Sequence, residues 1–580
     1  MQDSNTDAIR WLEYDDGAFK RAASENKPIL LAISAVWCHW CHVQDKTTYS
    51  DPEVLRLINR DYVPIRVDND KRPEVNRRYN MGGWPTTAFL TPDGDVIAGG
   101  TYIPPNEMKD ALRKIKALYL QRKTKPASTA ASREISERQV TAEISQGVID
   151  DVLTSVVMSF DSAYGGFGDN AKFPQTDALE LALAQYWYSR DKGLLTVVTK
   201  TLDHMAEGGI YDHEDGGFFR YSTARDWSTP HYEKMCEDNA KLVTLYLHAY
   251  QATGRDEYKR VASEIIRYVH GTLADRERGG FYGSQDADED YYKLTKDERA
   301  KIRAPQIDQT VYTNWNGLMI SAYLNAAEIL NDPKLREFAL KSTERILAEA
   351  YNQASNALCH YVSGGMPHVE DLLDDHAALG QALIDAYQAT GDFRYVSHVE
   401  ELVRHIDETL LDAKNGGYYD SPPKRDAPGY LRRLDKPLDE NSAASMVLTR
   451  LYHLTDDETR LERSKSTLNA LVRGYVAYGH VASGYALAVD LFLNQATRIV
   501  VAGPKKDATT LQLHEAAMRA YDPRKLIVLL DSDTDTERLR RLGYPTELEP
   551  RAYVCVGKTC LPPVTDPAEI QNQLLELRHN

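Results

Sequence analysis

The chain has 580 residues, 42% of them hydrophobic, and a formal net charge of −17. This length predicts about three to five domains, each long enough to bury a core of its own. The negative charge argues against a general binder of nucleic acids or anionic membranes, because both reward surplus Lys and Arg. The six cysteines are too sparse for a disulfide scaffold.

The N-terminus lacks the basic start and apolar core of a secretory signal, and no window approaches 18 uninterrupted apolar residues. We therefore expect a cytoplasmic protein with no membrane partner and no nucleic-acid partner. In a reducing compartment an isolated C-x-x-C pair more often serves catalysis or metal binding than structure. The pair at Cys38 and Cys41 is therefore a candidate functional site.

Cys38 and Cys41 lie between a predicted strand, KPILLAISAVW at 27–37, and a predicted helical segment that is broken near Pro52. The free N–H groups and the dipole at a helix start favour a thiolate. A protonated His39 acts in the same direction. This context predicts a redox dithiol in which Cys38 attacks and Cys41 resolves.

The same stretch, WCHWCH at 37–42, allows two other chemistries. C-x-x-C-H attaches c-type haem, but that attachment implies export, and no export signal is visible. A zinc site would need two thiols and two imidazoles to converge from one helical turn, and neighbouring residues on a helix do not face each other. We therefore expect no metal and no cofactor here. An inert module of the same fold is the remaining alternative.

After the dithiol the chain continues with a strand at 62–70 and two strands within 82–102 that join at a Pro-Asp-Gly turn. This order of elements resembles the thioredoxin fold. The resemblance implies that Pro85 is cis and faces the dithiol, and that Trp84 lies beside Cys38. Ala32 occupies the position of the buried Asp of thioredoxins, which argues against a general reductant.

A polar, helical linker is predicted at 121–147, and a repeat follows it. Gly-Gly-aromatic motifs recur at 164–168, 215–220, 278–286 and 415–420, and the phrase AYQATG occurs at both 249–254 and 386–391. Pairs of amphipathic helices lie between these motifs. About twelve helices between 148 and 493 predict a closed (α/α)6 toroid, with an open α-solenoid as the alternative.

The last part of the chain, 494–580, alternates short apolar strands with helical segments and predicts a small α/β domain. The predicted domains are therefore 1–120, 121–147, 148–493 and 494–580. Cys555 and Cys560 are predicted to form a local disulfide or to stay free. Cys236 and Cys359 are predicted to be buried like small hydrophobic residues.

Specific motifs spread along the chain, WCHWCHV, GGWPTTAFLTPDG, PHYEKMCEDNA and CLPPVTDP, resemble the spermatogenesis-associated, thioredoxin-domain-containing family. The resemblance implies a thioredoxin-like N-terminal domain fused to a toroid of the six-hairpin glycosidase and N-acylglucosamine 2-epimerase type. HVQDKTTYSD at 42–51 departs from the family's usual sequence beside the dithiol.

By this resemblance, a sugar would bind in a funnel lined by inner-helix ends and the loops between hairpins. Aromatic rings stack on sugar faces, and paired carboxylates supply general acid and base groups. The candidate substrate-binding residues are His213, Tyr221, Trp227, His231, Glu233, Asp238, Asp286, Asp288 and Asp374. Asp238 and Asp374 could instead be helix N-caps, and Asp286 and Asp288 a solvated turn.

The sequence as a whole predicts a thiol-disulfide oxidoreductase module fused to a carbohydrate-processing or sugar-binding toroid. Its substrates would be a protein disulfide and a sugar. Two alternatives stay open: a catalytically silent scaffold whose toroid binds a sugar or a protein, and a sugar epimerase or glycosidase whose thioredoxin-like part is structural.

Overall fold

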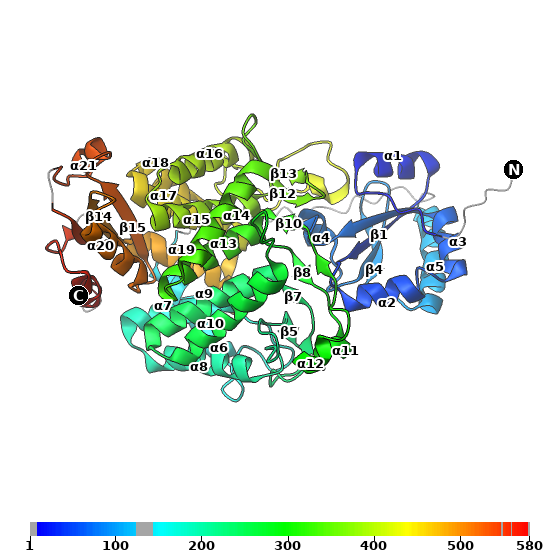
Figure 1. Cartoon of the computed structure of the whole chain (residues 1–580). Helices are drawn as coiled ribbons and strands as arrows, with labels where there is room; N and C mark the ends of the chain where they lie inside the picture. The colour runs from blue at the N-terminus through cyan, green and yellow to red at the C-terminus, as the bar shows by residue number, and fades with distance from the viewer. Residues whose placement is uncertain (1–7, 123–142, 547–548, 558, 578–580) are drawn as a thin grey trace. The chain divides into compact units, whose positions relative to one another are not determined.

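The computed structural model describes residues 8–122, 143–546, 549–557 and 559–577, and it divides into two compact units (Figure 1). The first unit comprises residues 1–141, 286–288 and 421–435. The second comprises 142–285, 289–420 and 436–580. Residues 123–142, most of the predicted linker, lie outside the described residues.

The first unit has a four-stranded sheet in the order β2-β1-β3-β4. Strand β1 pairs parallel to β2 and antiparallel to β3, and β3 pairs antiparallel to β4. This is the thioredoxin-like arrangement that the sequence predicts. The strands are β1 (Ile29–Ser34), β2 (Val63–Asp68), β3 (Thr86–Leu90) and β4 (Val96–Gly100), and the helices are α1 (Asp16–Glu25), α2 (His39–Thr47), α3 (Pro52–Asp61), α4 (Pro73–Tyr79) and α5 (Pro105–Arg122).

The central strand β1 is buried because cores form on both faces of this sheet. Ile29, Leu31 and Ile33 belong to one core. Leu30 and Ala32, which point the other way, belong to the second. A strand covered on both faces reads as a continuous apolar run, which explains the ILLAI segment. The strand ends just before Cys38 and so fixes where the dithiol lies.

The second unit contains a closed ring of six inner helices. Each inner helix packs against the next, in the order α7, α9, α13, α15, α17 and α19, and α19 packs back against α7. This closure confirms the toroid and rules out the open solenoid. The inner helices are α7 (Thr176–Ser189), α9 (Cys236–Thr253), α13 (Thr313–Ile329), α15 (Leu373–Thr390), α17 (Leu438–Thr455) and α19 (Ser483–Asn494).

Each inner helix also packs against one outer helix. The outer helices are α6 (Gln146–Ser159), α8 (Lys192–Glu207), α10 (Asp256–Tyr268), α14 (Pro333–Glu349), α16 (Arg394–Thr409) and α18 (Glu458–Leu471). Inner and outer helices alternate along the chain. The six inner helices therefore run in one direction, and their N-termini meet at one end of the ring.

The Gly-Gly motifs are the turns that lead from an outer helix to the next inner helix. Both glycines of each motif have φ between 68° and 85° (165–166, 216–217, 279–280 and 416–417). A side chain is strained in this left-handed region, so glycine is required there. The repeat seen in the sequence is therefore a backbone requirement of the ring.

A buried cation stabilises each of these turns. Lys234 Nζ lies 2.6 Å from Asp212 Oδ2 and donates to the Gly216 carbonyl at 2.8 Å. Lys436 Nζ makes the same pair of contacts, at 2.7 Å to Asp412 and at 2.6 Å to the Gly416 carbonyl. Lys172 and Arg345 repeat the arrangement with Asp161 and Asp275 and with the first-glycine carbonyls. A buried charge needs such partners, so these loop residues are structural.

A buried asparagine on the inner helix completes the turn. Asn441 Oδ1 accepts from the Tyr418 backbone N–H at 2.7 Å, and its Nδ2 donates to the carbonyls of Tyr418 and Pro437. Asn239 and Asn316 make the corresponding three contacts at their turns. One side chain thus satisfies three buried backbone groups.

The C-terminal part of the second unit is a small α/β sheet in the order β15-β14-β16-β17, as predicted. Its strands are β14 (Thr497–Gly503), β15 (Lys525–Asp531), β16 (Arg551–Val556) and β17 (Thr559–Cys560), and its helices are α20 (Ala508–Arg519), α21 (Thr536–Arg541) and α22 (Pro567–Leu577). Cys555 and Cys560 form a disulfide between β16 and β17, and Cys236 and Cys359 are buried and free.

This α/β part is fixed to the C-terminal ends of the inner helices by ion pairs and hydrogen bonds. Arg524 donates two bonds to Asp490 of α19, at 2.7 and 2.8 Å. Tyr188 of α7 donates to Asp522 at 2.8 Å. The ring therefore has one end covered by residues that precede and begin β15.

One described segment, Tyr475–Asn494, is long and apolar enough to cross a membrane, with a mean hydropathy of 1.3. It is not one continuous helix, because Gly479 interrupts it with φ 55° and ψ −130°. Its second half is α19, which packs against α6, α7 and α17. The core helix of a toroid has the same length and composition.

We predict that Asn441→Ala lowers the free energy of unfolding by about 2–4 kcal/mol, because three buried backbone groups lose their partner. Denaturant unfolding measured by circular dichroism checks this. Asn352→Ala is the matched control, since Asn352 is exposed and accepts a single hydrogen bond, from Ala354. Equal effects of the two changes would show that the turn contacts do not stabilise the ring.

Candidate functional sites

The first candidate site is the dithiol of the thioredoxin-like unit. Cys38 is the N-cap of α2, and its Sγ accepts from the backbone N–H of Cys41 at 3.2 Å. The two cysteines are joined as a disulfide, and both are buried. An N–H group of the first turn of α2 therefore points at the Cys38 sulfur, as the sequence predicts for a thiolate site.

Aromatic residues and a cis proline surround this dithiol. The Trp84–Pro85 bond is cis, as predicted. Trp84 packs edge-on against Trp37, the residue before Cys38, with ring centroids 5.8 Å apart. Trp37 Nε1 donates to Asp70 at 2.6 Å, which fixes its ring. The dithiol thus lies in a rigid aromatic setting.

The outer side of the dithiol is exposed. His39 is exposed, and the Trp40 ring, 47% exposed, lies 5.3 Å from the Tyr102 ring. His42 Nε2 lies 3.4 Å from Asp286 Oδ2, and this carboxylate raises the pKa of His42. Asp286 and the exposed Asp288 belong to this unit, so the structure does not group them with the ring, where the sequence predicts them.

The second candidate site is the end of the ring where the inner helices begin. Five of the six inner helices have a polar or acidic residue at their second position: Asp177, Glu237, Asn314, Asp374 and Asp439. The sixth has Gly484, and a Cβ there would lie 3.1 Å from Asp177 Oδ2. Because the helices are parallel, these side chains gather at one end of the ring.

Opposing charges set the protonation of this cluster. Lys241 Nζ lies 2.8 Å from Glu237 Oε1 and lowers the pKa of Glu237. Burial, and then the Glu237 charge, raise the pKa of Asp238 to about 7. Burial also raises the pKa of Asp374 to about 6, although Asn314 donates to it at 2.6 Å. Neighbouring carboxylates of one site thus titrate apart.

The alternative that Asp238 and Asp374 are N-caps is wrong. The N-cap residues of α9 and α15 are Met235 and Leu372, and neither side chain makes a capping bond. Asp238 and Asp374 lie inside the first turns of their helices, where a carboxylate faces the helix dipole. Burial disfavours the ionised form of both carboxylates even there. Helix capping therefore does not explain why Asp238 and Asp374 occupy these positions.

A stack of rings lies in the loop that precedes α9. Tyr221 stacks on Phe173 and on His231, with centroid distances of 4.5 and 4.6 Å. His231 Nδ1 lies 3.3 Å from Glu233 Oε2, and the other oxygen of Glu233 lies 3.6 Å from Arg220 Nη1. Glu233 and Arg220 both act on the charge of Asp238. The structure therefore brings together the predicted Tyr221, His231, Glu233 and Asp238.

Two other predicted residues do not join this cluster. Trp227 is fully buried and donates from Nε1 to the Tyr164 carbonyl at 2.9 Å, so it cannot form a funnel wall. His213 is exposed, and its Nε2 lies 3.1 Å from the Gly208 carbonyl. Both lie in loops rich in polar and aromatic groups, but those loops fold back to support the Gly-Gly turns.

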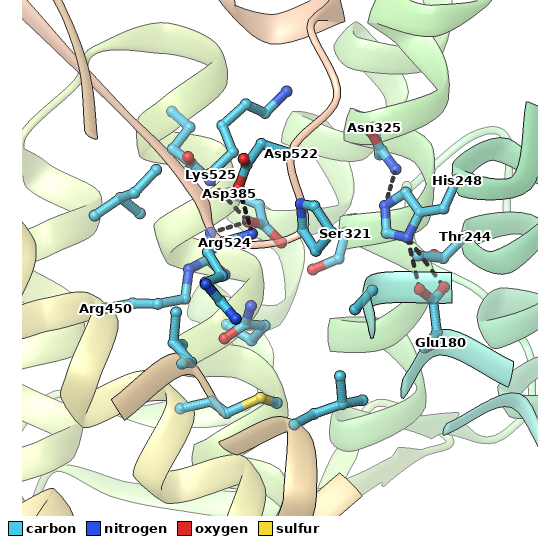
Figure 2. A pocket seen from close by; sticks show the side chains of 18 of the residues that line it. Glu180, Thr244, His248, Ser321, Asn325, Asp385, Arg450, Asp522, Arg524 and Lys525 are labelled. Atoms are coloured by element: carbon cyan, nitrogen blue, oxygen red, sulfur yellow. Dashed lines mark hydrogen bonds and ion pairs between the residues drawn. The ribbon is translucent and has the colours of Figure 1, made fainter. Parts of the chain in front are cut away.

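The lumen of the ring is a cavity of about 410 Å³ lined by all six inner helices. It reaches Asp177 and Lys241 at one end and residues 521–527 at the other. Figure 2 shows its polar lining side chains. This volume is in the usual range for small-molecule sites.

A connected row of side chains from three helices lines the lumen (Figure 2). His248 Nδ1 lies 3.0 Å from Glu180 Oε1, and its Nε2 lies 3.3 Å from Asn325 Nδ2. The carboxylate accepts and the amide donates, so Nδ1 carries the proton and Nε2 the lone pair. Sequence analysis missed this row because its members are far apart in the chain and occupy the inward faces of different helices.

The opposite wall of the lumen is also charged. Arg450 of α17 donates to Asp385 of α15 at 2.7 Å, and Gln388 donates to the same carboxylate at 3.0 Å. Burial lowers the pKa of Lys525, at the covered end, to about 8. The lumen therefore offers donors and acceptors on several sides, as recognition of hydroxyl groups requires. Among the described residues, a group with metal-ligand donor atoms is Asp371, His376 and His405.

The fold defines a thioredoxin-like domain joined to an (α/α)6 toroid. Residues 1–138 match the Thioredox_DsbH family, described as a protein of unknown function, DUF255. Residues 170–430 match the N-acylglucosamine 2-epimerase family.

The resemblance predicted from the motifs is confirmed over nearly the whole chain. The chain is 26% identical to spermatogenesis-associated protein 20 of Homo sapiens, over 98% of this chain and 90% of that protein. It is 23% identical to a cellobiose 2-epimerase of Bacteroides fragilis, over 37% of this chain and 54% of that protein. The solved cellobiose 2-epimerase of Spirochaeta thermophila is 16% identical, with a TM-score of 0.49, over 59% of this chain and 94% of that one.

We predict that Asp374→Asn stabilises the protein more at high pH than at low pH. The folded protein holds the Asp374 proton up to about pH 6, whereas the unfolded chain loses it near pH 4. Stability is therefore lost as pH rises through this window, and ionised Asp374 remains unfavourable above it.

The gain of Asp374→Asn over the native chain should grow by about 1–2 kcal/mol between pH 4.5 and pH 8, measured by urea unfolding. Glu207→Gln removes an exposed carboxylate on outer helix α8 and should show no such growth. A gain that does not change with pH, or a loss at pH 8, would contradict the assigned electrostatics.

Proposed function

We propose that the chain combines thiol–disulfide exchange at Cys38 and Cys41 with carbohydrate binding and acid–base chemistry in the toroid. The observation that supports the first activity is the backbone N–H of Cys41 at 3.2 Å from the Cys38 sulfur. The exposed Trp40 beside it offers an apolar contact for a protein substrate. We place this activity in the reducing cytoplasm, where cellular thiols would keep the pair reduced.

In the proposed exchange the Cys38 thiolate attacks one sulfur of a substrate disulfide, and the other substrate sulfur leaves as a thiolate. The Cys41 thiolate then attacks Cys38 and releases the second substrate sulfur. Two electrons pass to the substrate, which becomes a dithiol, while Cys38 and Cys41 become the disulfide. A small-molecule thiol or a second dithiol protein must reduce that disulfide before the next turnover.

We predict that Cys41→Ser accumulates a stable mixed disulfide with glutathione when glutathione disulfide is added, while Cys38→Ser does not. Cys41 is needed to release the first partner, and Cys38 to capture it. Intact-protein mass spectrometry at pH 7 measures the adduct. Cys236→Ser is the control, because the Cys236 thiol is fully buried and burial raises its pKa above the usual range.

The same reduced proteins also test reactivity. Iodoacetamide should label Cys38 of the native chain near neutral pH and label Cys41 only after unfolding. Labelling of Cys38 that follows an ordinary thiol, with half-reaction near about pH 8.5, would contradict an activated site and favour the inert thioredoxin-like module.

The toroid proposal is supported by the unlike protonation of neighbouring carboxylates at the inner-helix starts. Asp238 keeps its proton to about pH 7, whereas Glu237 stays ionised beside Lys241. One can donate a proton and the other can accept one or stabilise a cation, the pairing used on glycosidic bonds. The acidic cluster disfavours anionic ligands, so we propose a neutral mono- or disaccharide.

A second reaction class is favoured by one observation in the lumen. His248 presents a fixed tautomer, oriented by the Glu180 carboxylate, and an oriented imidazole is a general base. Proton removal from a sugar carbon next to its carbonyl, followed by return on the other face, would epimerise the sugar. Hydrolysis and epimerisation give different products, so product analysis separates them.

We predict that neutral mono- or disaccharides bind the native chain, and that Asp238→Asn and Glu233→Gln each weaken binding or turnover at least tenfold with the fold intact. Calorimetric titration against a sugar panel, with product analysis by NMR, makes the measurement. Glu207→Gln on the outer surface is the control. Unchanged binding and turnover in both variants would show that these residues support the loop only.

A further inference from the structure

Three side chains with metal-binding atoms meet where inner helix α15 begins. Asp371 lies two residues before α15, His376 in its first turn, and His405 on the outer helix α16. One oxygen of Asp371 and one ring nitrogen of each histidine lie within 4.8 Å of one another. His405 Nε2 is 2.9 Å from Asp371 Oδ1, and His376 Nε2 is 3.9 Å from it.

His376 presents a lone pair that nothing among the described residues uses. Its Nδ1 lies 2.9 Å from the Leu372 carbonyl, which can only accept, so Nδ1 carries the proton. Its Nε2 is buried without a hydrogen-bond partner, and the side chain is 1% exposed. A buried acceptor of this kind costs about 1–3 kcal/mol unless something binds it.

This position differs in charge from the corresponding positions before α9 and α17. Lys234 and Lys436 lie two residues before those inner helices, and each places an ammonium group beside an aspartate. The residue two before α15 is Asp371, a carboxylate. At this junction the chain thus provides an anion and two imidazoles where the α9 and α17 junctions provide a lysine.

We propose that Asp371, His376 and His405 bind a divalent first-row transition metal ion, with Zn²⁺ as the natural probe. Two imidazole nitrogens and one carboxylate oxygen suit Zn²⁺, Fe²⁺ or Co²⁺, whereas Mg²⁺ and Ca²⁺ prefer oxygen ligands throughout. The ion would supply the positive charge that lysine supplies at the α9 and α17 junctions. A fourth position stays for water or a ligand.

Binding an ion would draw the three donor atoms, which lie within 4.8 Å of one another, closer together. Metal–ligand bonds of about 2.0–2.1 Å in a tetrahedral site put donor atoms roughly 3.3–3.5 Å apart, between the two distances from Asp371 given above. The Leu372 carbonyl already orients the His376 ring in the way that supports a metal ligand. His405 would carry its proton on Nδ1 when Nε2 binds the ion.

The test uses the full chain, freed of metal with a chelator and kept oxidised so that Cys38 and Cys41 cannot bind zinc. Titration with Zn²⁺ should show one site per chain and a rise in the unfolding temperature, because the ion binds the folded state. Asp371→Asn and His405→Gln should each weaken Zn²⁺ binding at least tenfold and remove most of that rise. Co²⁺ should show the visible absorption of a tetrahedral site and lose it in the same variants.

His398→Gln is the matched control, since His398 lies on the same outer helix and pairs with Glu401 at 3.2 Å. It should bind Zn²⁺ as the native chain does. No uptake of Zn²⁺ by the native chain would overturn the proposal, as would uptake that Asp371→Asn and His405→Gln leave unchanged. Loss of binding in Asp238→Asn instead would place the ion at the inner-helix starts and would equally overturn it. Asp371→Asn keeps the size of the side chain. Comparing the unfolding of the metal-free variant with that of the metal-free native chain therefore shows whether the change weakens folding or only metal binding.

Discussion

The ring depends on the cation that binds each of the four Gly-Gly turns, because this contact holds the loop that leads to the next inner helix. Lys234, for example, binds Asp212 and the Gly216 carbonyl while its neighbours start α9. Moving a helix start by one residue would rotate every inward side chain by about 100°. Because four turns share this device, the second residues of the inner helices meet at one end of the ring.

The two candidate sites use the same physical resource in separate units. The Cys38 sulfur accepts from the Cys41 N–H in the first turn of α2. Asp374 and Asp238 lie in the first turns of inner helices, whose dipoles point the same way. In the first case the N–H group favours a sulfur anion. In the second, burial and mutual repulsion outweigh the dipoles, so some carboxylates keep their protons near neutral pH.

Motifs and periodicity predict the fold well because each reports a local backbone requirement. Gly-Gly pairs report positive φ, the apolar run before Cys38 reports a strand covered on both faces, and Pro85 is in the predicted cis bond. The site is harder to predict because its members are brought together by ring closure. His248 meets Glu180 across 68 residues. The prediction that Trp227 binds substrate was wrong, because its loop is polar and aromatic in order to support a turn.

The polar residues at the second position of the inner helices could have been found from the sequence. Aligning the predicted helix starts places Asp177, Glu237, Asn314, Asp374 and Asp439 in one column of the alignment. The proposed metal ligands could not, since they come from a strand end and two helices and have no fixed spacing. The sequence predicts no metal, and at the dithiol the structure shows a disulfide. His376 stands out because its Nε2 is buried without a hydrogen-bond partner. The spacing of residues in the sequence does not report side-chain burial.

Gly484 makes the ring of inner-helix starts asymmetric, because it has no side chain where the other five helices have one. If all six inner helices ended in the same group, a sugar at the axis would have six equivalent orientations, and a fixed acid and base could act on one of them. That rotational degeneracy would waste up to a factor of six, about 1 kcal/mol. With Gly484 at the sixth start, Asp177 occupies the space beside it, 3.1 Å from where a Cβ would be. The missing side chain thus adds to the asymmetry that Glu237 and Asn314 already give the inner-helix starts.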